Sequence, residues 1–189
     1  MSRKTDKAYF DQLYTETRDP WNFAGSDYER HKYGRTLAAL PEEPFQDALE
    51  IGCSIGVLTE LLAPRCATLT ALDISEAPLE LARMRLHTQK HVSFFCASVP
   101  AEFPDEMYNL ILLSEVGYYL SRDELLVTKE LIVEHLKNSG VCCLVHWRPK
   151  IPECELTGDD VHALFADMRW QTIFHEENEQ FMIDVFRLF

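Results

Sequence analysis

Two stretches of the sequence decide the fold, Ala48-Leu49-Glu50-Ile51-Gly52-Cys53-Ser54-Ile55-Gly56-Val57-Leu58-Thr59 and Leu69-Thr70-Ala71-Leu72-Asp73. The first combines an apolar run, a turn of small residues and a second apolar run, which predicts a strand, a tight turn and a helix. The second predicts another strand, which ends on the acid Asp73. Glycine lets a ligand approach the backbone closely, and a strand-end carboxylate can accept hydrogen bonds from both hydroxyls of a ribose. With the acid Glu50 before the turn, the pattern indicates a cofactor that contains a nucleoside.

The spacing of the glycines narrows the class of ligand. Only G-x-x-x-G is present, because Cys53-Ser54-Ile55 separates Gly52 from Gly56, whereas a dinucleotide fingerprint needs G-x-G-x-x-G. Val57-Leu58 stands where a phosphate-binding loop carries Lys followed by Ser or Thr. The turn therefore favours a ligand without phosphates, and S-adenosylmethionine fits. Asp73 follows Gly52 by 21 residues (73 − 52), the offset expected of a ribose-binding acid. An ordinary strand, turn and helix followed by a chance acid is the alternative.

Length and composition fit one globular domain over residues 1–189, since 47% of the 189 residues are hydrophobic. The formal net charge of −13, without a basic run, argues against a nucleic-acid partner.

The sequence has no segment that is typical of a membrane span or a signal peptide. The longest apolar runs, Leu110 to Leu113 and Val141 to Val145, are too short to span a membrane, and no apolar segment follows Met1 to Lys7 as a signal peptide requires. Six cysteines, none in C-x-x-C spacing, indicate free thiols in the reducing cytoplasm.

Segments with helical and strand-like patterns alternate along the rest of the chain. Pro100, Pro104 and Asp105 disfavour a helix between the third and fourth strands. Helices are expected over residues 5–17, 27–40, 55–63 and 157–167, and two more begin after Ser75 and Ser121, the latter ended by Ser139-Gly140. Strands are expected over residues 47–51, 68–72, 92–96, 108–113, 141–147, 171–175 and 181–188.

This alternation predicts an α/β fold. Strands joined through helices form a mostly parallel sheet with helices on both faces, and a terminal hairpin at Glu177-Asn178-Glu179 makes the last strand antiparallel. We therefore expect a Rossmann-like, seven-stranded sheet in one domain.

Five short motifs carry a resemblance that runs from about Asp19 to Phe186. They are Asp19-Pro20-Trp21, Tyr28-Glu29-Arg30-His31, Glu50-Ile51-Gly52-Cys53-Ser54, Leu62-Ala63-Pro64 with Cys66, and Ser114-Glu115-Val116-Gly117-Tyr118-Tyr119-Leu120, the last being the most specific. With these motifs the chain resembles the class I S-adenosylmethionine-dependent methyltransferases. Within that fold it is similar to the nodulation protein S (NodS) type of N-methyltransferase.

The resemblance implies methyl transfer from S-adenosylmethionine to a small amine, such as a deacetylated amino sugar or oligosaccharide. Three positions depart from the family's pattern: Ser54 stands where many methyltransferases carry a second glycine, Asn109 stands where an Asp commonly opens the fourth strand, and His146-Trp147-Arg148 is not what NodS leads us to expect. Two alternatives stay open. One is an O-methyltransferase that acts on a small metabolite, and the other is a protein that binds the cofactor without activity.

Ligands in open α/β sheets bind at the carboxyl ends of the strands, which places the candidate cofactor site. Asp73 should bind the ribose, Ile74 should cover one face of the adenine, and Ala97-Ser98 should lie at the adenine edge. The resemblance implies that residues 1–44 cover the cofactor, with Trp21 as a wall or lid and Tyr28 near its amino-acid end. The candidate cofactor-binding residues are Trp21, Tyr28, Gly52, Cys53, Ser54, Gly56, Asp73, Ile74, Ala97, Ser98, Ser114 and Glu115.

Methyl transfer is an in-line displacement, so the protein mainly has to align donor and acceptor. An amine must also lose a proton, which a polar side chain can take. The catalytic candidates are Glu115, Tyr118 and His146, with Tyr119 beside them. Tyr119 can equally be core packing, and His146 can be a strand-end histidine bonded to backbone.

Two further sets of polar residues have ordinary explanations. Arg30 and Lys32 could meet the cofactor's carboxylate, but a solvated helix face explains them better. His87 and His91 are four residues apart, a spacing that metal ligands use on helices, yet they straddle a helix end. We expect no metal site.

Overall fold

The computed structural model describes residues 6–167 and 169–189, and its centre is a seven-stranded sheet of order β3-β2-β1-β4-β5-β7-β6. Every neighbouring pair from β3 to β5 is parallel, and β7 runs antiparallel to both β5 and β6. This confirms the predicted sheet with its antiparallel last strand. The strands are β1 (Phe45–Ile51), β2 (Cys66–Asp73), β3 (Val92–Cys96), β4 (Tyr108–Ser114), β5 (Leu136–Trp147), β6 (Trp170–Glu177) and β7 (Phe181–Leu188).

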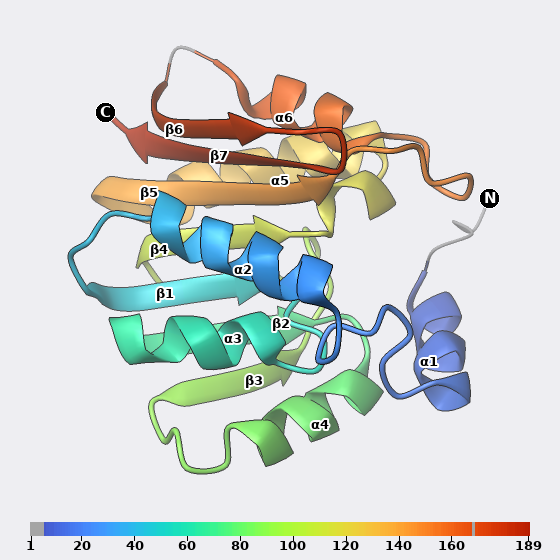
Figure 1. The fold of residues 1–189 in the computed structure, drawn as a ribbon. Coiled ribbons are helices and arrows are strands. Elements are labelled where there is room, and N and C mark those ends of the chain that lie inside the picture. The colour runs from blue at the N-terminus through green and yellow to red at the C-terminus, as the bar shows by residue number, and fades with distance from the viewer. Residues whose placement is uncertain (1–5, 168) are drawn as a thin grey trace.

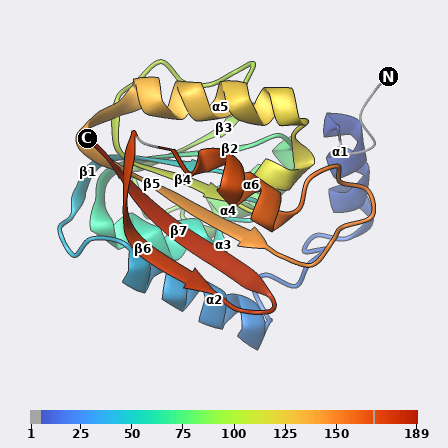
Figure 2. The same cartoon turned by 90° about the horizontal axis from the view of Figure 1, so that it is seen from above.

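Helices cover both faces of this sheet. Figure 1 and Figure 2 show α2 and α3 on one face and α5 on the other, with α6 on the same side as α5. Helix α1 lies apart from these layers, beside the edge toward which the parallel strands point. The helices are α1 (Lys7–Glu16), α2 (Asp27–Ala39), α3 (Val57–Leu62), α4 (Glu76–Arg85), α5 (Arg122–His135) and α6 (Gly158–Phe165), with short 3-10 turns η1 (Ala63–Arg65) and η2 (Gly117–Tyr119).

Successive side chains of the central strands enter two separate cores. Leu49 of β1 and Ile111 of β4 pack with residues of α5 and α6, whereas Ala48 and Leu110 pack with residues of α2 and α3. Both sets are buried, because a parallel strand at the centre of an α/β sheet is covered on both faces. This explains the continuous apolar runs in the sequence.

Capping residues define most helix starts as the sequence indicates. Ser121 and Glu124 form a reciprocal capping box at α5, and Thr157 and Asp160 form another at α6. Ser75 precedes α4 without capping it, since its hydroxyl donates to Asp11 of α1 at 2.7 Å. The expected cap is therefore replaced by a contact between two helices.

The predicted end of α5 is wrong. The helix stops at His135, and β5 begins at once with Leu136, although Ser139-Gly140 suggested a helix terminus. These two residues form an irregularity in β5 instead: the register with β4 shifts there, and Ser139 has a φ of 61°. Turn-forming residues serve a bulge as well as a helix end, because both need unusual backbone angles.

Other predicted elements agree closely with the structure. No helix lies between β3 and β4 over residues 97–107, where prolines disfavour one. The first helix is found at Lys7–Glu16. Residues 1–5, which belong to the segment expected not to be a signal peptide, lie outside the described part of the chain. Among residues 6–167 and 169–189, no helix has the length and apolar character needed to cross a membrane.

Candidate functional site

A cavity of about 530 Å³ opens at the carboxyl ends of β1, β2 and β4. Helix α1, the segment that joins it to α2, and the start of α2 form its outer wall. The cavity brings together most of the residues that the sequence singles out. Those that line it are Trp21, Tyr28, Gly52, Ser54, Asp73, Ile74, Ala97, Ser98, Ser114, Glu115, Tyr118 and Tyr119.

Three of the candidates are not in the cavity wall. Cys53 is buried beneath the turn. Gly56 precedes α3 with a φ of 77°, and a Cβ there would lie 2.9 Å from Cβ of Ala82, so it serves the close packing of α3 on α4. His146 is fully buried behind the wall and accepts a hydrogen bond from the backbone of Gly117, as its alternative interpretation proposes.

The turn after β1 needs a glycine at its first position. Gly52 has a φ of 87°, and a Cβ on it would lie 2.2 Å from Cγ2 of Val116 and 2.9 Å from the carbonyl oxygen of Ser114. Without a side chain, the backbone here forms part of the cavity wall. The close approach of a ligand to this backbone stays a prediction.

Ser54 occupies a left-handed position in the same turn, with a φ of 49°. Its hydroxyl lies 2.5 Å from the hydroxyl of Tyr14 on α1, and both groups are buried. The backbone angle explains why glycine commonly stands at this position. In this chain the serine gains a hydrogen bond that a glycine could not make.

Asp73 is held rigidly at the end of β2. One carboxylate oxygen accepts from the backbone N–H of Ser54 at 2.9 Å, and the other accepts from the backbone N–H of Ser75 at 3.0 Å. Burial raises the pKa of this carboxyl to about 6, against the opposing effect of these two backbone donors. Each oxygen keeps a further lone pair, so the carboxylate can accept two more hydrogen bonds from a ligand.

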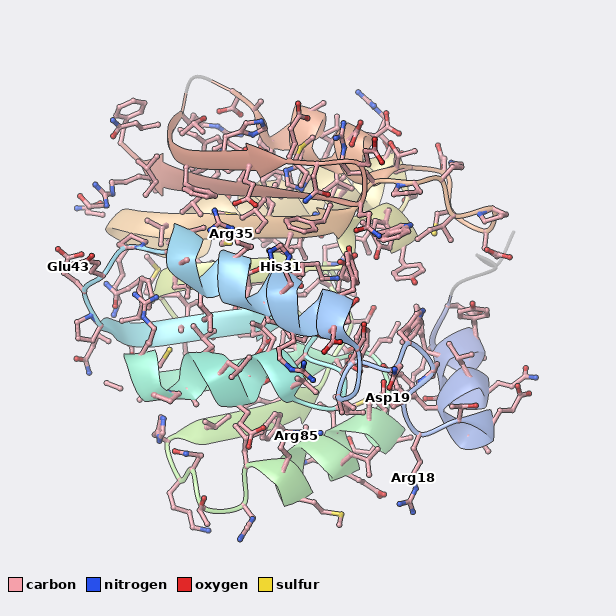
Figure 3. All side chains as sticks on the ribbon, in the orientation of Figure 1. Arg18, Asp19, His31, Arg35, Glu43 and Arg85 are labelled. Carbon is pink, nitrogen blue, oxygen red and sulfur yellow. The ribbon has the colours of Figure 1, made fainter. Side chains whose placement is uncertain are left out.

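Helix α1 is fastened over this edge by polar contacts. Lys7 donates to the carbonyl oxygen of Ile74 at 2.8 Å, and Asp11 accepts from Ser75. The linker after α1 is folded by Asp19, whose carboxylate accepts from the backbone N–H groups of Phe23 and Ala24 at 2.8 and 3.0 Å. Figure 3 shows Asp19 in this linker, between α1 and α2.

Asp19 therefore shapes the loop that presents Trp21 to the cavity. The Trp21 ring stacks on Phe23 at 5.4 Å between centroids and meets the edge of Tyr14 at 5.8 Å. With 37% of its surface exposed, Trp21 is a wall residue that still faces solvent. Its place agrees with a cover and with packing, the two interpretations left open by the sequence.

Lys32 corrects the expectation of a solvated helix face. Its side chain is only 2% exposed and lies 3.0 Å from Glu29 and 2.5 Å from Glu115. Burial alone would lower the pKa of Lys32, but the two carboxylates outweigh it and raise the pKa above its ordinary value. Arg30 behaves as expected, since its exposed side chain pairs only with Asp27 on the helix surface.

Glu115 stands at the centre of the opposite end of the cavity. Its φ of 59° is left-handed, which turns the side chain toward α2 and β5. One carboxylate oxygen receives Lys32, and the other accepts from the hydroxyl of Tyr118 and from the backbone N–H of Trp147 at 2.9 Å. Three donors thus orient the carboxylate, and one of them is a buried cation.

The residues between these two ends are aromatic or weakly polar. Tyr28 meets the edge of Trp147 at 5.6 Å between ring centroids, and its buried hydroxyl has no hydrogen-bond partner among the described residues. Ile74, Ala97 and Ser98 form a half-buried wall beyond Asp73, where the adenine is expected. An orphaned hydroxyl in a cavity wall fits a ligand that supplies its partner.

Metal ligation finds no support in the two candidate histidines. His87 bonds to the carbonyl oxygen of Met84 at 3.0 Å, and His91 bonds to that of Ala63 at 3.0 Å. Within the described ranges, no group of three or more His, Cys, Asp or Glu side chains is arranged so that it could hold a metal ion.

Several residues that line the cavity are not predicted from the sequence. Among them are Lys32, which was expected on a solvated helix face, and Tyr14, for which the sequence indicates no role. The spacing of Glu29 and Lys32 along α2 is a signal for an ion pair on one helix face. No local signal reveals that Glu115, 83 residues away, completes this pair and buries it.

Comparison with known proteins places this cavity in a family context. The family model described as nodulation protein S (NodS) matches residues 7–162. A nodulation protein S from Rhizobium tropici is 36% identical over 103 residues, which are 54% of this chain and 43% of the relative. The chain spans about half the length of the curated relatives that it matches.

Two solved structures share the fold. The N-methyltransferase NodS of Bradyrhizobium japonicum WM9, in complex with S-adenosyl-L-homocysteine, superposes with a TM-score of 0.87 at 22% identity and covers 97% of this chain and 99% of its own. A putative methyltransferase of Pseudomonas syringae is 34% identical with a TM-score of 0.76, over 85% of this chain and 98% of that one. Since the family model matches most of its length, the chain belongs to the nodulation protein S (NodS) family.

Proposed function

We propose that this chain is an S-adenosylmethionine-dependent methyltransferase that methylates the nitrogen of a small amine, such as a deacetylated amino sugar or oligosaccharide. The observation that carries the proposal is the cavity at the carboxyl ends of β1, β2 and β4, where the fixed carboxylate of Asp73 faces a turn opened by Gly52. Membership of the NodS family and the complex of a family member with S-adenosyl-L-homocysteine support it.

The charges of the cavity favour this cofactor over a phosphate-bearing nucleotide. The acidic lining residues are Glu29, Asp73, Glu115 and Glu153. Lys32 is the one cation among the described lining residues, and two of those acids already neutralise it. A phosphate would meet an acidic wall, whereas the sulfonium and ammonium groups of S-adenosylmethionine are attracted to it.

We assign the turn and the end of β2 to the adenosyl part of the cofactor. Asp73 accepts both ribose hydroxyls on its remaining lone pairs, and Ile74 covers one face of the adenine. The backbone at Gly52 passes beneath the methionine part. Because Asp73 is fixed by two backbone N–H groups, it binds the ribose without ordering a mobile side chain.

The opposite end of the cavity receives the methionine carboxylate and the acceptor. The unpartnered hydroxyl of Tyr28 is placed to meet the carboxylate, with Ser114 beside it. Glu115 and Tyr118 face the space where the acceptor enters. In this assignment Glu115 binds the acceptor's ammonium group and takes its proton, directly or through water, so that the nitrogen attacks with a free lone pair. Tyr118 fixes Glu115.

S-adenosylmethionine supplies, when bound, a methyl group that is already activated by its positive sulfur. The residues of this chain then have to align the acceptor nitrogen, exclude water and accommodate a proton. Burial and the negative charge of Glu115 raise the pKa of Tyr118 well above its ordinary value, so its hydroxyl stays protonated and donates. An acidic, aromatic-lined end suits an amine better than a neutral hydroxyl, which favours N-methylation over O-methylation.

We also propose how the chain is organised, what kind of acceptor it takes and where in the cell it acts. Residues 1–44 act as a cover on a single domain of residues 1–189, as the contacts of α1 with Ser54, Ile74 and Ser75 suggest. A small molecule is the acceptor, and a net charge of −13 speaks against a nucleic acid. The six cysteines are free thiols, in keeping with a cytoplasmic location.

Two measurements test the proposed function. Calorimetry with S-adenosyl-L-homocysteine should give a single site, and the Asp73→Ala variant should bind more weakly. Mass spectrometry with labelled S-adenosylmethionine should then find a methylated product among glucosamine oligomers and polyamines, and none among phenols.

The alternatives give different results in the same assays. Products among the phenols alone would establish an O-methyltransferase. Cofactor binding with no product from any acceptor would establish a binding protein without activity. A failure to bind S-adenosyl-L-homocysteine would overturn the cofactor assignment and everything that depends on it.

A further inference from the structure

Behind the cavity, a line of buried hydrogen bonds runs from β7 to the loop that carries Glu115. Asp184 on β7 lies 2.6 Å from Nδ1 of His162 on α6. Nε2 of His162 lies 3.1 Å from Nδ1 of His146 on β5. Nε2 of His146 accepts from the backbone N–H of Gly117 at 3.1 Å. We call Asp184, His162 and His146 the histidine chain.

Only the outer end of the histidine chain meets solvent. Asp184, His162 and His146 are 6%, 3% and 0% exposed. His175 on β6 is half exposed and contacts the second oxygen of Asp184 at 2.7 Å. Burial lowers the pKa of His146 well below its ordinary value, and the cation of Lys32 acts in the same direction. His146 is therefore neutral in the folded protein.

The hydrogen-bond partners fix where each proton lies. The backbone N–H of Gly117 can only donate, so Nε2 of His146 must accept, and a neutral His146 then carries its hydrogen on Nδ1. That hydrogen points at Nε2 of His162, which leaves Nδ1 of His162 to donate to Asp184. A single arrangement satisfies every group, and it begins at the Asp184 carboxylate.

The backbone at Gly117 is packed tightly against this arrangement. A Cβ on Gly117 would lie 2.6 Å from Cγ1 of Val161 and 2.9 Å from Nε2 of His146. Gly158 at the start of α6 is equally close to β5, because its Cβ would lie 3.1 Å from Cβ of His146. His146 thus packs between two glycines, with Gly117 against its ring and Gly158 against its Cβ.

The hydrogen bond between His146 and Gly117 is linked to the cavity through the residues that follow each of them in the sequence. Tyr118 follows Gly117, and its hydroxyl donates to Glu115. Trp147 follows His146, and its backbone N–H donates to the same carboxylate oxygen at 2.9 Å. Both groups that orient this oxygen of Glu115 are therefore one residue away from the bond between His146 and Gly117.

We propose that the histidine chain is a positioning device, in which Asp184 and His162 select the tautomer of His146 that holds Gly117 and thereby aims Tyr118 and Glu115 into the cavity. Among the described residues, no hydrogen bond joins the histidine chain to a side chain of the cavity, and the contact of Tyr118 with His146 is ring edge to face, 5.5 Å between centroids. The device therefore orients the site and does not carry protons to it. Its effect on turnover rests on the proposed function, but its structural effect does not.

The first test needs no activity. In nitrogen NMR of the histidine-labelled protein, the resonances of His146 should show a protonated Nδ1 and an unprotonated Nε2 that do not titrate between roughly pH 6 and 8. A charged His146, or the opposite tautomer, overturns the proposal.

The second test uses three variants of two histidines. His162→Phe keeps a ring but gives His146 no acceptor, whereas His162→Gln can still accept from it. His175→Gln, outside the histidine chain, is the matched control. In His162→Phe the amide of Gly117 should exchange its hydrogen roughly tenfold faster, as the loss of one buried hydrogen bond predicts. His162→Gln should recover most of the protection, and His175→Gln should keep all of it.

Turnover adds a measurement that a purely structural role would not move. With an acceptor found as described above, His162→Phe should lower kcat by roughly ten- to a hundredfold while the affinity for S-adenosyl-L-homocysteine stays unchanged, because only the alignment of Tyr118 and Glu115 is lost. Equal exchange of Gly117 in wild type and His162→Phe overturns the proposal whether or not the protein is a methyltransferase. If His162→Phe does not fold, the tautomer of His146 and the exchange rates in His162→Gln still decide.

Discussion

The two ends of the cavity are formed by different kinds of groups, backbone atoms at one end and charged side chains at the other. The turn end, made of Gly52, Ser54 and Asp73, is shaped by backbone groups and by the absence of a side chain at Gly52. The carboxylate end, made of Lys32 and Glu115, is held by side chains from α2 and from the loop after β4. The first should therefore be most sensitive to added volume, and the second to a lost charge.

Removing the cation of the carboxylate end should have the largest effect. In Lys32→Met, Glu29 and Glu115 would stay buried without a partner, so we expect a loss of about 3–5 kcal/mol in the free energy of unfolding. Urea denaturation measures this loss. Arg30→Met, on the exposed face of the same helix, is the control and should change stability by less than about 1 kcal/mol. Equal effects in the two variants would show that the buried pair does not stabilise this end.

Adding one carbon at the turn end should cost somewhat less. In Gly52→Ala the new Cβ meets Val116 and the Ser114 carbonyl, and a left-handed backbone adds strain, so we expect a loss of about 3 kcal/mol in the free energy of unfolding. Gly34 of α2 has open space around it, so Gly34→Ala should be neutral or slightly stabilising. A tolerated Gly52→Ala would contradict the close packing of this turn.

Removing the carboxylate of Asp73 should have the next largest effect, on the affinity for the cofactor. Asp73→Ala should weaken the binding of S-adenosyl-L-homocysteine by about 1–3 kcal/mol, because two charge-assisted hydrogen bonds to the ribose are lost. Calorimetry on the folded variant measures the change. Asp47→Ala, at the other end of the neighbouring strand, removes an acid that pairs with Lys137 and should leave the affinity unchanged.

The raised pKa of Asp73 gives this binding a pH dependence. In the proposed assignment, binding needs the ionised carboxylate, whose pKa burial raises to about 6. Affinity should therefore be constant above this value and fall about tenfold for each pH unit below it. Asp73→Asn should abolish this dependence. Glu50→Gln should retain it, although burial raises the pKa of Glu50 to about 7. If the pH dependence of affinity disappears in Glu50→Gln, then Glu50 and not Asp73 is the group that titrates.

The smallest effect concerns the contact between α1 and the turn end. Tyr14→Phe removes the hydrogen bond to Ser54 and should lower the free energy of unfolding by about 1 kcal/mol. A double-mutant cycle with Ser54→Ala isolates the pair, and the two losses should not add. Strict additivity would mean that the two hydroxyls do not interact in solution.

The sequence predicts the turn end well because its signals are local. The apolar runs, the glycines and the offset of Asp73 lie within one unit of strand, helix and strand, and β3 and β7 have the predicted bounds. Prolines correctly exclude a helix between β3 and β4. The end of α5 was missed because Ser139 and Gly140 have the chemistry of a helix terminus and of a bulge alike.

The carboxylate end could not be predicted in the same way. A lysine on a polar helix face has the same local pattern whether that face meets solvent or a distant acid, so the burial of Lys32 depends on Glu115 across the fold. His146 was placed correctly at a strand end, but alternation along β5 turns its ring toward α6 and leaves Trp147 to line the cavity. The burial of Lys32 and the orientation of His146 become evident only from the residues that the tertiary structure brings next to them.

Ser54 has a consequence for how this turn can change in evolution. Serine costs about 1–2 kcal/mol of backbone strain in a left-handed position and recovers part of it through the hydroxyl of Tyr14. A change to glycine would relax the loop and remove one of the contacts that hold α1. The side chain at position 54 thus trades backbone strain in the turn against the attachment of the amino-terminal helix.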